Sequence, residues 1–198
     1  MIYIIAGIAK SGKTTIAKEF TKRYNIPYFS TDYIMMMLHR GNPDIDVDPE
    51  LSDSSVAKQI QPYVYGMIKT MVENKVDYLL EGVHFNPDFA SELLKEYPND
   101  IKIVYLGYKD ISVTLKVIEL NKYQKILENV WYSSFSDKKM NELILYLINE
   151  SKRAYELCML FGLKYIEVYD LNIQINEIID SIYNHKNNER KCGEFYDI

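Results

Sequence analysis

Eight residues near the start of the chain have the types and spacing of a phosphate-binding loop. The segment from Gly7 to Thr14 reads GIAKSGKT, which fits the P-loop pattern G-x-x-x-x-G-K-[ST]. Its two glycines allow backbone angles that a side chain would forbid, so successive N–H groups can turn inward around an anion. Lys13 is placed to reach the β and γ phosphates of a nucleotide, and the Thr14 hydroxyl is placed to bind Mg²⁺. The alternative is a plain glycine turn with an exposed lysine.

The flanking sequence favours the phosphate-binding interpretation. Residues 2–6 form a short apolar, β-branched run of the kind that makes a buried parallel strand. Residues 14–24 carry apolar side chains at helical spacing, so a helix should point its positive end at the same anion. We therefore predict that the chain binds ATP together with Mg²⁺. The residues expected to hold the nucleotide are Gly7, Ile8, Ala9, Lys10, Ser11, Gly12, Lys13, Thr14 and Thr15.

Two acidic residues stand where later strands are expected to end. Residues 26–29 are predicted to form the second strand, shortly before Asp32, and residues 77–82 the third, which contains Glu81. Because ligands of open parallel sheets bind beyond the carboxyl ends of the strands, both acids should face the nucleotide. Asp32 can accept a proton from a substrate hydroxyl, hold Mg²⁺ or cap the next helix, and Glu81 has the Walker B position beside the metal. The predicted catalytic residues are Lys13, Asp32 and Glu81, and the predicted metal ligands are Thr14, Asp32 and Glu81.

A phosphoryl acceptor needs contacts of its own, and the predicted acceptor contacts are Asp32, Arg40, His84 and Lys122. Arg40, at the end of a helix expected over residues 33–40, could clamp an anionic group or complement the helix dipole. His84, just after the third strand, could contact the acceptor or serve as a hydrogen-bonded loop residue. Arg153 is a candidate contact to the nucleotide. Lys122 and Arg153 could equally be parts of solvated helix faces.

The composition favours one acidic domain. The chain has 198 residues and a formal net charge of −5, whereas a nucleic-acid binder usually carries a basic excess. No apolar run is long enough to span a bilayer, and the first strand starts at once, so we expect neither a membrane segment nor a signal peptide. Cys158 and Cys192 lie far apart without metal-ligand spacing, which predicts a reduced, cytoplasmic protein.

The remaining elements can be placed from apolar periodicity. We expect a single domain over residues 1–184, followed by a loosely held tail over 185–198. The fourth and fifth strands should cover residues 101–107 and 164–169. An insertion at about 41–74, expected to bind the acceptor, combines a loop rich in glycine, proline and acids with a long helix that Pro62 should kink or divide.

The chain resembles the small P-loop kinases related to nucleoside monophosphate, shikimate and gluconate kinases, over about residues 1–184. The resemblance rests on the P-loop, on Ser30-Thr31-Asp32 and on the run LEGVHFNP from Leu80 to Pro87, and the last two stretches look most like the 2-phosphoglycerate kinase-like branch. It implies a three-layer α/β/α fold around a five-stranded parallel sheet in the order 2-3-1-4-5, and phosphoryl transfer from ATP. It also implies that Glu81 lies beside the metal and His84 near the acceptor.

The sequence departs from these kinases at the positions that supply positive charge. Lys10 stands where many of them have glycine or another small residue, which would add charge near the γ-phosphate. The predicted lid, at about residues 122–136, joins a helix over about 111–127 to one over 137–161, capped by Ser136 and ended by Gly162. Lids of such kinases normally bring arginines to the transferring phosphoryl group, but this region offers Lys116, Lys122 and Lys125.

The sequence as a whole predicts an ATP-dependent kinase that acts on a small hydroxyl- or phosphate-bearing metabolite. A nucleoside monophosphate kinase is the nearest alternative, and the lack of lid arginines counts against it. A P-loop ATPase or nucleotide switch has water or a partner protein in place of the metabolite. A polynucleotide-end kinase is disfavoured by the acidic charge balance.

Overall fold

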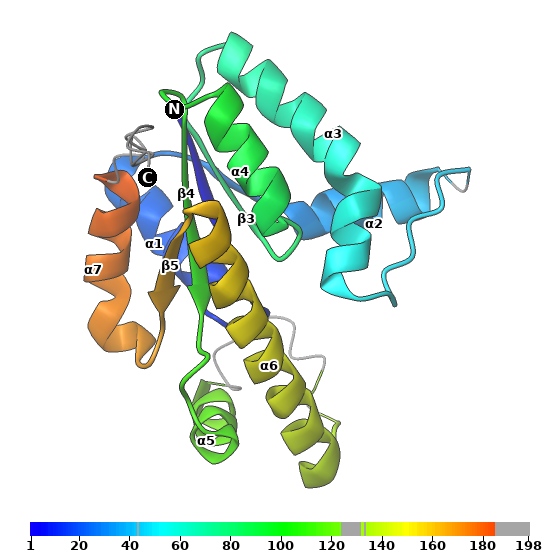
Figure 1. The fold of residues 1–198 in the computed structure, drawn as a ribbon, viewed down its shortest axis with the longest axis vertical. Coiled ribbons are helices and arrows are strands. Elements are labelled where there is room, and N and C mark those ends of the chain that lie inside the picture. The colour runs from blue at the N-terminus through cyan, green and yellow to red at the C-terminus, as the bar shows by residue number, and fades with distance from the viewer. Residues whose placement is uncertain (43, 124–131, 133, 185–198) are drawn as a thin grey trace, which may run out of the picture.

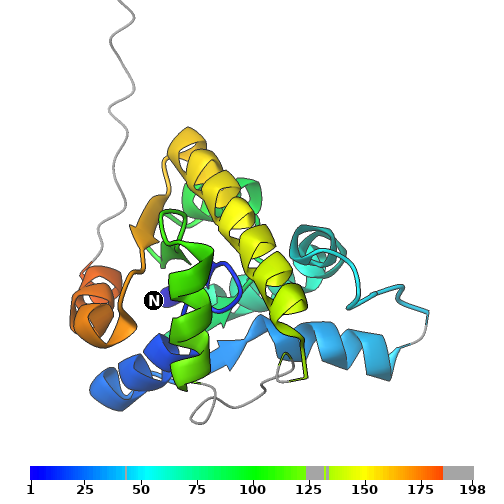
Figure 2. The same ribbon diagram turned by 90° about the horizontal axis from the view of Figure 1, so that it is seen from below.

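The computed structural model describes residues 1–42, 44–123, 132 and 134–184. Five parallel strands form one sheet in the order β2-β3-β1-β4-β5, which confirms the expected α/β architecture and strand order (Figure 1). The carboxyl ends of the strands lie at the lower edge in Figure 1, the edge that Figure 2 views from below. The strands are β1 (Ile2–Gly7), β2 (Tyr28–Ser30), β3 (Tyr78–Gly82), β4 (Ile101–Gly107) and β5 (Lys164–Glu167).

Helices cover both faces of the sheet. The helices are α1 (Lys13–Tyr24), α2 (Thr31–Gly41), α3 (Asp53–Glu73), α4 (Pro87–Glu96), α5 (Val113–Tyr123), α6 (Asp137–Phe161) and α7 (Leu171–Tyr183). Helices α1 and α7 pack on one face, and α3, α4 and α6 on the other (Figure 1). Beyond the carboxyl ends of the strands, α5 packs against the first half of α6 (Figure 2).

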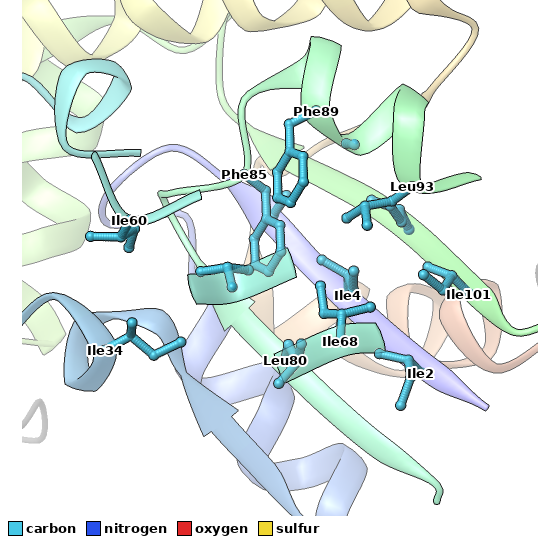
Figure 3. Close-up of a cluster of buried hydrophobic side chains, with 14 of the residues drawn as sticks. Ile2, Ile4, Ile34, Ile60, Ile68, Leu80, Phe85, Phe89, Leu93 and Ile101 are labelled. Atoms are coloured by element: carbon cyan, nitrogen blue, oxygen red, sulfur yellow. The ribbon is translucent and has the colours of Figure 1, made fainter. Parts of the chain in front are cut away.

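The alternation of side chains along β1 divides the core into two layers. Ile2, Ile4 and Ala6 point into the cluster shared with α3 and α4, part of which is shown in Figure 3. Tyr3 and Ile5 point the other way, toward α1 and α7. All of these side chains are buried, and burial of each large apolar side chain contributes about 1.5–3 kcal/mol to folding. The phosphate loop therefore leaves the sheet from its most thoroughly packed strand.

Several helix ends lie where the sequence predicts them, and others differ from the prediction. Helix α6 begins after Ser136, whose Oγ accepts a hydrogen bond from Lys139 N, and ends at Gly162 with a φ of 68°, both as expected. The cap of α2 is Ser30, whose Oγ accepts from Asp32 N, so the alternative that Asp32 caps this helix was wrong. Helix α3 is one continuous helix with Pro62 inside it, rather than two segments.

The sequence analysis did not anticipate α4 and α7, although both carry ordinary start signals. Helix α4 begins at Pro87, directly after Asn86, and proline is favoured at the first position of a helix. Helix α7 begins after Asp170, whose side chain accepts hydrogen bonds from Asn172 N and Ile173 N. Within the described residues no helix is both long and apolar enough to cross a membrane. Most of the predicted lid and the whole predicted tail, including Lys125 and Cys192, lie outside the described residues.

A close approach between β3 and α2 depends on Gly82. A Cβ atom on Gly82 would lie 1.8 Å from Thr31 Oγ1, far inside van der Waals contact. Because Thr31 is fully buried, it has no free space into which to retreat. The absence of a side chain at Gly82 thus allows the first turn of α2 to sit directly against the end of β3.

We expect Gly82→Ala to destabilise the fold by about 1–3 kcal/mol, the usual effect of overpacking a filled site. Chemical denaturation of the purified protein measures this loss. Gly66→Ala is the matched control, because Gly66 lies on the exposed side of α3 with nothing within 4 Å of the added Cβ. The control should be neutral or stabilising by about 0.5–1 kcal/mol. Equal effects at the two glycines would contradict the close approach.

Candidate functional site

The phosphate loop is held in a tight curve between β1 and α1. Gly7 and Gly12 have φ angles of 133° and 89°, which side-chain-bearing residues rarely adopt. A Cβ on Gly7 would lie 2.0 Å from Leu106 O, and a Cβ on Gly12 2.6 Å from Leu171 Cδ2. The loop is therefore enclosed by β4 on one side and by the start of α7 on the other.

Several polar groups of the loop fit an anion. Helix α1 has Gly12 as its N-cap, with no side-chain hydrogen bond to its first N–H groups and no acidic residue in its first turn. Such N–H groups, together with the helix dipole, favour an anion at the helix start. The buried Oγ of Ser11 likewise lacks a hydrogen-bond partner. A phosphate group would satisfy both, so the residues of this loop fit a bound nucleotide.

Lys13 is a nearly buried cation at the centre of the loop. Only 7% of its surface is exposed, and its Nζ donates a hydrogen bond of 2.8 Å to Ile8 O. Burial lowers the pKa of Lys13, while the negative charges of Glu81 and Asp32 oppose that shift. A carbonyl oxygen compensates an ammonium only in part, so a phosphate that enters the loop would replace a weak partner with a strong one.

Thr14 and Glu81 meet between the loop and the end of β3. Thr14 Oγ1 donates a hydrogen bond to Glu81 Oε1 at 3.2 Å, and Glu81 is 3% exposed. A hydroxyl and one carboxylate beside a phosphate site suit Mg²⁺, which prefers oxygen ligands and takes most of the others from water and phosphates. No group of three or more His, Cys, Asp or Glu among the described residues could hold a metal by itself. The donor set therefore fits a metal that arrives with a nucleotide.

Asp32 and His84 come together beside Lys13, although they are far apart in sequence. His84 Nδ1 lies 2.8 Å from Thr31 Oγ1 and 3.7 Å from Asp32 Oδ1. His84 is 3% exposed, whereas 64% of the Asp32 side chain remains open to solvent. Burial lowers the pKa of His84, and Asp32 opposes the shift. Near neutral pH the imidazole is therefore uncharged and fixed, and the accessible group of the pair is the Asp32 carboxylate.

Asp53 is a member of this cluster that the sequence analysis missed. It is the first residue of α3, and an acidic residue in the first turn of a helix does not by itself indicate a functional site. Asn86 Nδ2 donates to Ser54 O at 3.1 Å, which ties the start of α3 to the loop after β3. Partial removal from water raises the pKa of Asp53, and the positive charge of Lys13 opposes the shift. Only the packing of α3 against the β3–α4 loop brings this residue to the site.

A cavity of about 300 Å³ opens beside the phosphate loop. Its walls come from the start of the loop, the first turns of α3, the β3–α4 loop and the middle of α6. Aromatic side chains and five charged residues face it; the polar and charged lining residues include Asp53, Lys58, Asn86, Asp88, Glu150 and Arg153. The volume is at the lower end of the range that small-molecule sites occupy.

The other predicted site residues fall in different places. Arg153 lines this cavity, and Thr15 is exposed in the first turn of α1. Arg40 is exposed in the last turn of α2 and does not line the cavity. Lys122 is exposed in the last turn of α5. Lys116 is fully buried, with Nζ 3.1 Å from Glu119 and 4.0 Å from the centroid of the Tyr108 ring, so its charge is already balanced within the protein.

Comparison with solved structures shows what the fold resembles. A shikimate kinase from Bacteroides thetaiotaomicron aligns over 91% of this chain and 94% of its own, with a TM-score of 0.53 and 14% sequence identity. A gluconokinase from Sinorhizobium meliloti 1021 aligns over 93% and 92%, with a TM-score of 0.53 and 12% identity. The fold is that of the P-loop kinases. No protein-family model matches the sequence, and no curated protein matches it either.

The surroundings of His84 predict a specific pH dependence. Because its pKa lies below the usual 6.5 in the folded protein, the unfolded chain takes up a proton first as the pH falls through 6.5. Its contribution to the free energy of unfolding is therefore complete above pH 6.5 and decreases below it, by at most about 1.4 kcal/mol per pH unit. Denaturant unfolding at a series of pH values measures the loss, and His84→Gln should reduce it.

The same expectation can be checked in the wild-type protein without a substitution. The ring protons of His84 in an NMR titration should show a midpoint below 6.5. A midpoint above 6.5 would contradict the neutral imidazole.

Proposed function

We propose that this protein is an ATP-dependent phosphotransferase that moves the γ-phosphoryl group of ATP to a small hydroxyl- or phosphate-bearing metabolite. The observation that carries the proposal is the position of the cavity: Gly7 and Ile8, the first residues of the phosphate loop, form part of its wall. A nucleotide held by the loop would therefore present its terminal phosphate to whatever the cavity binds. An ATPase needs no such second compartment.

The charges of the cavity favour a small acceptor with one or two anionic groups. Lys58 and Arg153 line it, and neither forms an ion pair with any residue that the structure describes. Both are free to bind a carboxylate or phosphate of the acceptor. Asp53, Asp88 and Glu150 line the same cavity and would repel a polyanion. This balance supports a metabolite over a nucleic-acid end.

The chemical step needs a base, positive charge and alignment, and the cluster offers all three. The acceptor oxygen attacks the γ-phosphorus, a new O–P bond forms, and the bond to the β–γ bridging oxygen breaks with its electrons leaving on ADP. The Asp32 carboxylate takes the proton of the acceptor hydroxyl. Lys13 stabilises the charge on the phosphates, and His84 keeps Asp32 in place. Mg²⁺ bound at Thr14, with Glu81 and Asp32 beside it, would supply further charge neutralisation.

The likeness to the 2-phosphoglycerate kinase-like branch is part of the same proposal. It rests on Ser30-Thr31-Asp32 and on the stretch around His84. The hydrogen bond between Thr31 and His84 joins these two stretches in one site. That contact supports a shared function for them, although it does not name the acceptor. Any sugar acid of suitable size, with or without a phosphate group, fits the description of a small anionic acceptor.

The direct test is ATP consumption with Mg²⁺ against phosphoglycerates, sugar acids, nucleosides, nucleoside monophosphates and a blank without acceptor. We expect one acceptor class to stimulate ADP formation, and Lys13→Ala to abolish the stimulation while the protein stays folded. Stimulation by nucleoside monophosphates would identify the nearest alternative. ATP hydrolysis that no acceptor changes would overturn the proposal in favour of an ATPase or switch.

The cavity predicts separate effects on rate and on acceptor binding. Asp32→Asn should lower kcat by about 10²–10⁴-fold, the usual contribution of a general base. Asp53→Asn, Lys58→Ala and Arg153→Ala should act mainly by raising the KM of the acceptor. Lys152→Ala is the matched control, because Lys152 is exposed on α6 and does not line the cavity. Unchanged KM values in all three cavity variants would contradict the assignment of the acceptor site.

A further inference from the structure

Lys10 has a backbone conformation that its side chain does not favour. Its φ is 63°, in the left-handed region that is natural for glycine. The other non-glycine residues with positive φ in the described part of the chain are Asn25 and Lys75, which follow the ends of α1 and α3. Left-handed residues are common after helices, but Lys10 ends no helix. Strained backbone conformations of this kind cluster at active sites and in ligand-binding loops.

The side chain of Lys10 lies near enough to Lys13 for their two positive charges to interact. Lys10 is half-buried, and burial and the charge of Lys13 both lower its pKa, while Asp32 opposes the shift. Its Nζ is 4.8 Å from the centroid of the Tyr132 ring. Tyr132 is buried in a cluster with Tyr108 and residues of α5 and α6, and Tyr108 donates to Ala9 O at 2.6 Å. The outer side of the loop is thus supported by the helices that follow β4.

The sequence supplies few arginines for this position. No arginine occurs between Arg40 and Arg153, a stretch that includes the whole predicted lid. Arg40 is exposed at the far end of α2, and Arg153 lines the cavity. Lys116 is paired with Glu119. Besides Lys13, Lys10 is the cation that the phosphate loop itself carries.

We propose, on the basis of the phosphotransferase function above, that Lys10 contacts the γ-phosphate and supplies the charge that arginines supply in many P-loop enzymes. In the step already described, negative charge moves onto the oxygens of the transferring group and of the departing ADP. The Lys10 ammonium donates hydrogen bonds to the γ-phosphate oxygens and keeps its protons throughout. The contact with the Tyr132 ring holds the side chain near this position before nucleotide binds. The left-handed backbone conformation at Lys10 directs its side chain from the loop toward the γ-phosphate.

The test compares Lys10→Gly, Lys10→Met and Lys10→Arg with the wild type. Glycine removes both the charge and the strained conformation, methionine removes only the charge, and arginine keeps the charge. Lys75→Gly is the matched control, because Lys75 is an exposed lysine with a φ of 54° that lines neither the phosphate loop nor the acceptor cavity. Both glycine variants should have a melting temperature equal to or above that of the wild type.

Two readouts decide the proposal. By titration calorimetry with Mg²⁺, Lys10→Gly and Lys10→Met should weaken ATP binding by at least about tenfold, as for loss of one charged hydrogen bond, while ADP binding changes by less than about twofold. In turnover, kcat should fall by about a hundredfold with little change in acceptor KM. Lys10→Arg should retain most of the ATP affinity and most of the kcat of the wild type. Lys75→Gly should retain the full ATP affinity and the full kcat.

Each failure has its own meaning. Equal losses of ATP and ADP affinity, or full turnover in Lys10→Gly, would overturn the role of Lys10 even if the wild type is an active kinase. A wild type that binds ATP but phosphorylates no acceptor would refute the proposed function instead. In that case the ratio of ATP to ADP affinity in the variants still decides whether Lys10 contacts the γ-phosphate.

Discussion

A lysine ammonium held almost out of water, with a carbonyl oxygen as its hydrogen-bond partner, is the interaction on which the site depends. Burial lowers the pKa of Lys13, and the negative charges of Glu81, Asp32 and Asp53, which come from three different elements, oppose that shift. An uncompensated buried cation is unstable, so the arrangement requires nearby anions. The phosphate loop and its acidic surroundings are therefore best understood as one electrostatic unit, complete only when a phosphate is added.

The geometry of the sheet makes this unit possible. Because β1 lies between β3 and β4, the loop after β1 and the acid near the end of β3 emerge side by side. The register pairs Ile5 with Glu81 and Ala6 with Gly82, so the two segments reach the edge together. Gly82 then lets α2 approach closely enough for Thr31 to hold His84. Two glycines in the loop and one at the end of β3 thus set distances that no larger residue would permit.

The parts of the site that could be predicted from the sequence are those set by local patterns. These are the P-loop motif and the places of Asp32, Glu81 and His84, which stand at or just after the ends of apolar strands. The strand order follows from the resemblance to small kinases. Asp53 and Lys58 could not be found in this way. Their positions in the cavity wall arise from the contact of α3 with the β3–α4 loop, and a helix start with an acid has many simpler explanations. Lys116 shows the reverse error, since a lysine considered as a source of positive charge for the lid is buried against Tyr108.

The most direct test of the central claim is a crystal structure with Mg²⁺ and a non-hydrolysable ATP analogue. The account predicts that the triphosphate lies in the loop of residues 7–14, with Lys13 Nζ moved from Ile8 O to the β and γ phosphates. Thr14 should leave Glu81 to bind the metal, and the terminal phosphate should face the cavity beside Gly7. A nucleotide bound elsewhere, or one bound while Lys13 stays on the Ile8 carbonyl, would contradict the account.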